Sequence, residues 1–233
     1  MINMDIKKHK KELLDILLFI YNDVDLIPAL RFKGGTAAYF MYGLDRFSLY
    51  LDFNLLQKDK SLLIYNKLES FIQTRGKVKD SRIKDNTIFF LYSYESGERN
   101  MKIEISTRDY GDKFDLLSYL GMNIWTMRKE YMFAHKLVDL TDRKRTASRD
   151  LFDIGFFFNH QWDFNPDIIY KRTGTHVREY FKYLLEFIPE KFPDNKLLYG
   201  LGEFITEDQK KYVKLELKKS VLSHLKVYLE LNK

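Results

Sequence analysis

The sequence contains no cysteine and only four proline residues among its 233 residues. Without cysteine the chain forms no disulfide bond and no thiolate metal site, a composition that fits a cytoplasmic protein. No stretch approaches the ~20 apolar residues that a membrane-spanning helix needs. The apolar run near the N-terminus is interrupted by Asp15 and has helical spacing without a small-residue cleavage site. We therefore expect an amphipathic first helix, and neither a signal peptide nor a membrane anchor.

Aromatic residues are abundant, with 19 Phe and 16 Tyr, and hydrophobic residues make up 45% of the chain. This length and composition allow one large domain or two modest ones with a substantial core. The formal net charge is +6, and lysines concentrate at residues 7–11 and 210–219. These clusters are explained either by solvated helix faces or by a surface for an RNA backbone or an acidic partner protein.

The hydrophobic pattern changes from strand-like to helix-like along the chain. Apolar residues predict a helix at 61–75 and strands at 47–55, 86–95 and 101–107. The strand signals end near residue 107, and helix patterns extend from residue 127 to the C-terminus. We predict an α+β protein with a small mixed β-sheet domain at residues 1–125 and a helical domain at residues 126–233.

The most informative segment runs from Phe32 to Leu56. A Gly-Gly-Thr turn (Gly34 to Thr36) precedes a short apolar helix, and the next strand places Asp52 on its polar face. Backbone N–H groups at a helix N-terminus bind phosphate oxygens, and a carboxylate binds the hard divalent ion that bridges them. The segment therefore predicts a site for a metal-bound triphosphate.

This segment resembles the nucleotidyltransferases of the polymerase-β superfamily, specifically the AbiEii-type toxins of bacterial abortive-infection and toxin–antitoxin systems. That family has a Gly-Gly-Thr turn followed by an Arg-x-Ser-x-Asp-x-Asp motif. The matching residues here are Gly34, Gly35, Thr36, Arg46, Ser48 and Asp52. The resemblance implies that the turn amides bind the β- and γ-phosphates, that Thr36 or Ser48 donates a hydrogen bond, and that Lys33 and Arg46 neutralise phosphate charge.

Tyr50 stands where the family has the first aspartate of its motif. A phenol is neutral near pH 7 and is a poor ligand for Mg²⁺, so two-metal phosphoryl chemistry loses a ligand shared by both ions. Three explanations stay open: a catalytically inactive relative, compensation by Asp45 or Asp109, or an altered residue in this sequence. We expect slow nucleotidyl transfer, which Tyr50→Asp raises.

Two further parts of the chain match the family. A third acidic residue on a later strand completes the metal site in the family, and Glu104 occupies that place, so Asp52 and Glu104 are the implied Mg²⁺ ligands. A helical lysine and an Arg-Asp-x-x-Asp motif follow, matched by Lys136, Arg149, Asp150 and Asp153. The resemblance implies that Lys136 and Arg149 contact the nucleotide and that Asp150 orients Lys136 or acts as a base. The alternatives are an exposed strand residue for Glu104 and a structural i, i+4 salt bridge for Arg149 and Asp153.

The implied activity is Mg²⁺-dependent transfer of a nucleotidyl group from an NTP to an acceptor hydroxyl, with tRNA as the favoured acceptor. The implied catalytic residues are Asp52, Glu104, Lys136 and Asp150, and the implied protein partner is a cognate antitoxin. The alternative is an inactive nucleotidyltransferase-like protein that acts by binding a nucleotide or a protein. Tyr50 favours this alternative, whereas the retained acidic and basic residues favour the enzyme.

Overall fold

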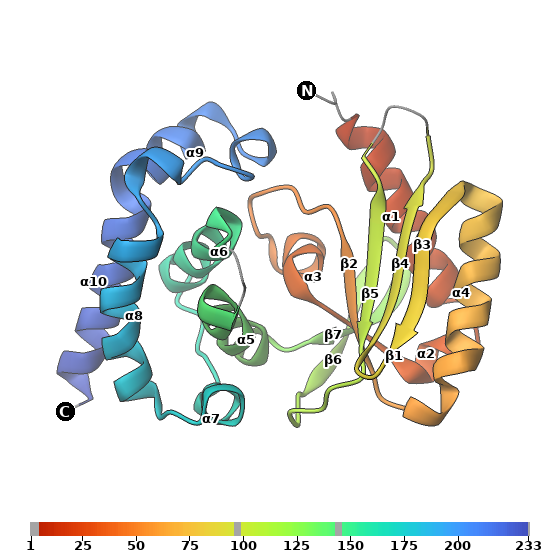
Figure 1. Cartoon of the computed structure of the whole chain (residues 1–233), viewed down its shortest axis with the longest axis horizontal. Helices are drawn as coiled ribbons and strands as arrows, with labels where there is room; N and C mark the ends of the chain where they lie inside the picture. Colours follow the sequence, from red (N-terminus) through yellow and green to blue (C-terminus); the bar gives the residue numbers. More distant parts are fainter. Residues whose placement is uncertain (1–4, 96–98, 143–145, 233) are drawn as a thin grey trace. The chain divides into compact units, whose positions relative to one another are not determined.

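The computed structural model describes residues 5–95, 99–142 and 146–232, which form two compact units (Figure 1). One unit comprises the described residues of Met1–Gly43 and Ser48–Met127, and the other those of Leu44–Phe47 and Arg128–Lys233. The chain leaves the first unit after Met127, close to the boundary expected near residue 125. The inclusion of Leu44–Phe47 in the second unit was not expected.

The first unit contains a seven-stranded mixed sheet, which agrees with the predicted fold class. Its strands are β1 (Leu30–Lys33), β2 (Leu51–Leu55), β3 (Lys77–Lys84), β4 (Thr87–Ser93), β5 (Met101–Ser106), β6 (Phe114–Tyr119) and β7 (Met122–Met127). Their order in the sheet is β3-β4-β5-β2-β1-β7-β6. β1 pairs with β7 and β2 pairs with β5 in parallel, and the remaining neighbours are antiparallel.

The helices of this unit are α1 (Ile6–Ile20), α2 (Leu26–Ala29), α3 (Gly34–Tyr42) and α4 (Ser61–Arg75), with a 3₁₀ turn at Lys58–Lys60. The predicted helix at 61–75 is therefore confirmed. α1 and α4 both contact one face of the sheet: Tyr92 of β4 donates a 2.9 Å hydrogen bond to Glu12 of α1, and Tyr65 of α4 stacks on Phe90 of β4. The apolar side chains at which α1, α4 and this sheet face meet, such as Leu13, Leu68 and Phe90, are fully buried and form the core. The opposite face carries Asp52.

The prediction that strands end near residue 107 is wrong, because β6 and β7 form a further hairpin. Leu120 (φ 48°) and Gly121 (φ 79°) join them in a two-residue turn with positive φ at both positions, which is the backbone that favours a hairpin. The edge strand β3 was also missed. Its sequence KVKDSRIK is mostly charged and largely exposed, which protects an edge from pairing with another chain but hides the apolar alternation.

The regular elements among the described residues of the second unit are all helical. Its helices are α5 (Lys129–Asp142), α6 (Ser148–Asn159), α7 (Pro166–Thr173), α8 (Val177–Lys191), α9 (Glu207–Tyr212) and α10 (Lys218–Leu231), with 3₁₀ turns at Asp194–Lys196 and Gly202–Phe204 and a π-helical turn at Val213–Leu217. Aromatic rings fill the core, where Phe133 meets Phe157 and Phe158 edge-on. Among the described residues, no helix is long and apolar enough to cross a membrane.

Candidate functional site

The Gly-Gly-Thr turn begins α3, as the sequence predicts. Gly34 has φ +77°, a left-handed conformation that a residue with a side chain rarely adopts. A Cβ atom built on Gly34 would lie 2.8 Å from Oδ2 of Asp52. The turn therefore lies directly against the Asp52 carboxylate, and any side chain at position 34 would displace it. The first turn of α3, with its backbone N–H groups, and the Asp52 carboxylate thus lie next to each other in the first unit.

Asp52 and Glu104 are register partners on the neighbouring parallel strands β2 and β5. The prediction that these two strands are neighbours is confirmed. Because paired residues point to the same side of a sheet and adjacent strands lie about 4.8 Å apart, both carboxylates lie on one face. Lys33 is the register partner of Asp52 on β1, so it extends the same row. The side chains of this row are only partly buried.

The backbone before Asp52 is held by side chains and not by a strand ladder. The predicted strand at 47–55 begins only at Leu51. Nε2 of the buried His9 ring lies 2.9 Å from the carbonyl oxygen of Leu49. The Thr36 hydroxyl donates a hydrogen bond to the carbonyl oxygen of Tyr50. These side chains take the carbonyl groups that a longer strand would offer to a neighbour, which explains the late start of β2.

Thr36 and Ser48 are both buried, and their hydroxyl oxygens lie 2.8 Å apart. A hydroxyl has a single hydrogen, so when Thr36 donates to the Tyr50 carbonyl, Ser48 donates to Thr36. The two hydroxyl groups thus connect the start of α3 to the segment before β2. This geometry favours a structural role for both residues, in place of the implied hydrogen bond to a phosphate.

Tyr50 precedes Asp52 by two residues and contacts a residue that the sequence did not single out. The Lys102 ammonium lies 5.1 Å from the centroid of the Tyr50 ring and 3.0 Å from Oε2 of Glu104. The alternation of MKIEIS already placed Lys102 and Glu104 on one strand face. The contact with Tyr50 depends on the β2–β5 pairing, which only the structure provides.

The remaining predicted residues form a buried ion-pair cluster in the second unit. Arg46 contacts Asp153 through two nitrogens, with Nε 2.5 Å from Oδ1 and Nη2 2.7 Å from Oδ2. Lys136 Nζ lies 2.9 Å from Oδ1 of Asp150 and 3.2 Å from Oδ2 of Asp153. All four residues are at most 7% exposed. Two cations and two carboxylates therefore balance each other away from water.

Burial disfavours the charged forms of Asp153 and Lys136, but the opposite charges beside them outweigh this penalty. Burial raises the pKa of Asp153, whereas the charges of Arg46 and Lys136 and their hydrogen bonds lower it, and the net pKa lies below its ordinary value. Burial lowers the pKa of Lys136, but Asp150 and Asp153 raise it above the ordinary value. Asp153 and Lys136 therefore both stay charged near neutral pH.

These contacts favour a structural role for Arg46, because its guanidinium holds the segment Leu44–Phe47 against α6. Lys136 is held by Asp150, which agrees with the interpretation that Asp150 orients the lysine. The partners found for Asp153 are Arg46 and Lys136, whereas the sequence suggested Arg149. Arg149 lies partly buried in the first turn of α6. The predicted site residues thus fall into two groups, one in each unit.

The carboxylates of the first group, Asp52 and Glu104, suit a divalent cation. Mg²⁺ is often held by one or two carboxylates, with water and substrate phosphates completing its six ligands. Asp52 and Glu104 supply two hard oxygen ligands on adjacent strands, which fits one ion. Among the described residues, no group of three or more His, Cys, Asp or Glu side chains is placed to hold a metal. The residues therefore fit one ion bound together with a triphosphate.

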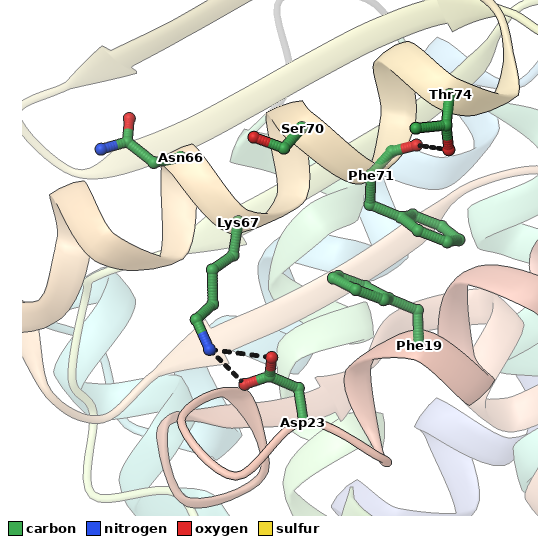
Figure 2. Close-up of a pocket in the computed structure, with 7 residues that line it drawn as sticks. All are labelled: Phe19, Asp23, Asn66, Lys67, Ser70, Phe71 and Thr74. Carbon is green, nitrogen blue, oxygen red and sulfur yellow. Dashed lines mark hydrogen bonds and ion pairs between the residues drawn. The ribbon is translucent and has the colours of Figure 1, made fainter.

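A hollow of about 520 Å³ lies elsewhere in the first unit, lined by residues of α1, α4 and the segment after α1. Figure 2 shows the Phe19 and Phe71 rings facing each other and Lys67 reaching Asp23. The hollow contains none of the glycine-turn residues and neither Asp52 nor Glu104. We therefore do not assign the triphosphate site to it.

Comparison with known proteins gives the family. The sequence matches the family described as nucleotidyl transferase AbiEii toxin, Type IV toxin–antitoxin system, over residues 16–221. The chain belongs to the AbiEii family. The match spans both units, so the sheet with its glycine turn and the helical unit are both parts of the family's fold.

Two solved structures have a similar fold. JHP933 from Helicobacter pylori is 23% identical, with a TM-score of 0.64, and the alignment covers 98% of this chain and 94% of that protein. A protein from H. pylori that is provisionally assigned as a nucleotidyltransferase is 24% identical, with a TM-score of 0.63 and coverage of 97% and 96%. A search of curated proteins finds no match.

A substitution in the glycine turn tests its closeness to Asp52. Gly34 and Gly43 have similar positive φ angles, +77° and +72°, but a Cβ on Gly43 meets no atom within 4 Å. We expect both Gly34→Ala and Gly43→Ala to lower the free energy of unfolding by about 1–2 kcal/mol through backbone strain. Only Gly34→Ala should also weaken Mn²⁺ binding, because it displaces the Asp52 carboxylate. Urea denaturation and calorimetric Mn²⁺ titration measure the two effects. Equal Mn²⁺ affinity in the two variants would contradict the assignment.

Proposed function

We propose that this AbiEii-family protein transfers a nucleotidyl group from an NTP to an acceptor hydroxyl, with tRNA as the favoured acceptor. The observation that carries the proposal is the arrangement around Asp52. This carboxylate is paired in register with Glu104, and the turn that starts α3 lies against it. A helix N-terminus beside two carboxylates suits a triphosphate with its divalent ion.

In this proposal the amides of Gly34 and Gly35 bind the phosphates, and Lys33 adds positive charge beside them. Asp52 and Glu104 hold Mg²⁺, which when bound neutralises phosphate charge and polarises the reacting phosphate. The acceptor oxygen forms a bond to the α-phosphorus, and the bond between that phosphorus and the pyrophosphate leaving group breaks. The hydroxyl proton passes to a Glu104 carboxylate oxygen and from there to solvent. The products are the nucleotidylated acceptor and pyrophosphate.

The second unit contributes through its charged groups. Asp150 and Asp153 fix the ammonium of Lys136, so the lysine keeps its charge while buried. Within the second unit, Asp150 keeps its proposed role of orienting Lys136, and Arg149 lies in the first turn of α6. We assign Arg46 a structural role, because Arg46 and its partner Asp153 are both buried in the ion-pair cluster.

The proposed partners follow from charge and family. The net charge of +6 favours an acceptor with a phosphate backbone, and tRNA carries both that backbone and a terminal hydroxyl. The Type IV toxin–antitoxin assignment of the family implies a cognate antitoxin protein. We propose that the protein acts in the cytoplasm, where NTPs and tRNA are present.

A second candidate function is supported by one observation. Tyr50 replaces a family aspartate, and Lys102 lies over its ring. A site changed in this way suits a protein that binds a nucleotide or a protein partner without transferring the nucleotidyl group. Both candidates include nucleotide binding, so only a transfer measurement separates them.

The transfer measurement uses the purified protein with each of the four NTPs labelled at the α-phosphate, Mg²⁺ and total tRNA. We expect label to enter tRNA from at least one NTP, with one pyrophosphate released per nucleotide and with no product after chelation by EDTA. Samples without tRNA control for hydrolysis of the NTP. Binding of an NTP without transfer to tRNA would favour the second candidate.

A further inference from the structure

The Lys102 ammonium occupies a defined place on the polar face of the sheet. It contacts Glu104 at 3.0 Å and lies 5.1 Å from the centre of the Tyr50 ring. Asp52 is the register partner of Glu104 and lies two residues after Tyr50, on the same face. Lys102 thus places its ammonium group beside the two carboxylates that are proposed to hold the metal ion.

The residue at position 50 explains why a lysine is accommodated there. The face of an aromatic ring attracts a cation, and such contacts contribute about 0.5–1 kcal/mol at partly exposed sites. The Lys102 side chain is 27% exposed and that of Glu104 is 41% exposed, so the pair is partly shielded from water. Tyr50 gives the ammonium an apolar support without a further negative charge. The residues at positions 50 and 102 therefore suit each other.

The same charge disfavours a second metal ion. An ammonium that contacts Glu104 repels a divalent cation at this place and occupies an oxygen that the cation would need. A fixed cation next to the reacting phosphates also stabilises the charge that develops on the leaving group, which is what a metal ion does electrostatically. One lysine can thus exclude the second ion and supply part of its effect.

We propose that Lys102 takes the place of one metal ion in this chain, so that the site works with one divalent ion and one lysine ammonium. This inference rests on the proposed nucleotidyl transfer. It changes the expectation for Tyr50→Asp, because a new carboxylate at position 50 pairs with Lys102. The single change therefore adds no second ion, whereas Tyr50→Asp combined with Lys102→Met does.

The test counts Mn²⁺ bound per chain by electron paramagnetic resonance, with the α,β-methylene analogues of the four NTPs and analogue-only blanks. We expect one Mn²⁺ in the parent, one in Tyr50→Asp and two in the Tyr50→Asp/Lys102→Met variant. Lys102→Met alone should bind its single Mn²⁺ about fivefold to tenfold more tightly, because a repulsive charge is removed. The same variant should transfer nucleotide to tRNA at least about tenfold more slowly. Lys84→Met, which removes an exposed lysine at the end of β3, should match the parent.

Two Mn²⁺ ions in the parent or in Tyr50→Asp would overturn the inference. A Lys102→Met variant with unchanged Mn²⁺ affinity and an unchanged rate of nucleotidyl transfer would also overturn the inference. In that case the proposed function still stands if Asp52→Asn loses the single Mn²⁺ ion. A parent that binds no Mn²⁺ with any analogue would instead refute the proposed function itself. Circular dichroism and thermal unfolding of each variant show whether it is folded.

Discussion

Asp52→Asn is expected to lower nucleotidyl transfer to tRNA by about 10²–10³-fold, the size of effect seen when one strong electrostatic contact to a transition state is removed. The substitution keeps the shape of the side chain and removes the charge that holds the divalent ion. Because the amide is nearly isosteric, the fold should change little. Initial rates with α-labelled NTP, compared at matched protein concentration, measure the loss.

Asp45→Asn and Asp109→Asn are the matched controls, because both residues are exposed carboxylates of the same charge. Asp45 belongs to the second unit, and Asp109 accepts a 2.8 Å hydrogen bond from the Gly111 N–H. We expect both variants to transfer nucleotide at the parent rate. A large loss in either would mean that this carboxylate compensates for Tyr50. Transfer that survives Asp52→Asn would refute the metal assignment.

Asp153→Ala is expected to lower the free energy of unfolding by about 3–5 kcal/mol, because it leaves the Arg46 guanidinium buried without its carboxylate. Asp153 is fully buried and contacts both Arg46 and Lys136. Replacing both members of the pair with apolar residues, in Arg46→Met/Asp153→Leu, should recover much of this loss, since no unpaired arginine then stays buried. Chemical denaturation measures all three proteins.

Asp208→Ala is the control for this second prediction. Asp208 and Lys211 form an i, i+3 pair at 3.4 Å with side chains 94% and 75% exposed. Removing the Asp208 carboxylate should change the free energy of unfolding by less than about 0.5 kcal/mol, because the pair is exposed. If Asp153→Ala costs no more than Asp208→Ala, the buried cluster does not stabilise the second unit.

The same cluster gives a pH dependence. The folded pKa of Asp153 lies below its ordinary value, so the ionised carboxylate stabilises the fold fully above the unfolded pKa of about 3.9 and this stability is lost as the pH falls through the folded pKa. The difference in stability between the parent and Asp153→Asn should therefore be constant from pH 5 to 7 and narrow only below about pH 4. A difference that narrows above pH 5 would contradict this assignment.

Much of the first unit could be predicted from sequence because its strands carry period-two patterns and its turn carries two glycines. The pattern located β4, β5 and α4, and placed Asp52 and Glu104 on polar strand faces. The period-two pattern failed for the edge strand β3, where protection of an exposed sheet edge determines the residue types. The edge strand β3 is charged because an exposed edge must not pair with other chains, and this removes the apolar alternation.

The site was predictable only in part because some of its contacts join residues far apart in the chain. The family resemblance implied that Arg46 neutralises phosphate charge, because Arg46 matches the first residue of the Arg-x-Ser-x-Asp-x-Asp motif. In the structure the segment Leu44–Phe47 belongs to the second unit, where Arg46 meets Asp153, 107 residues later. Lys102 was overlooked for the same reason, since its contact with Tyr50 exists only through strand pairing.

A crystal structure of the parent with Mn²⁺ and an α,β-methylene NTP analogue tests the central claim most directly, because the anomalous signal locates the ion independently of the protein atoms. We predict one Mn²⁺ peak bonded to oxygens of Asp52 and Glu104 at slightly more than the 2.0–2.1 Å typical of Mg²⁺, with the triphosphate at the N–H groups of Gly34 and Gly35. A bound analogue with Mn²⁺ away from both carboxylates, or an analogue bound away from the glycine turn, would contradict the account.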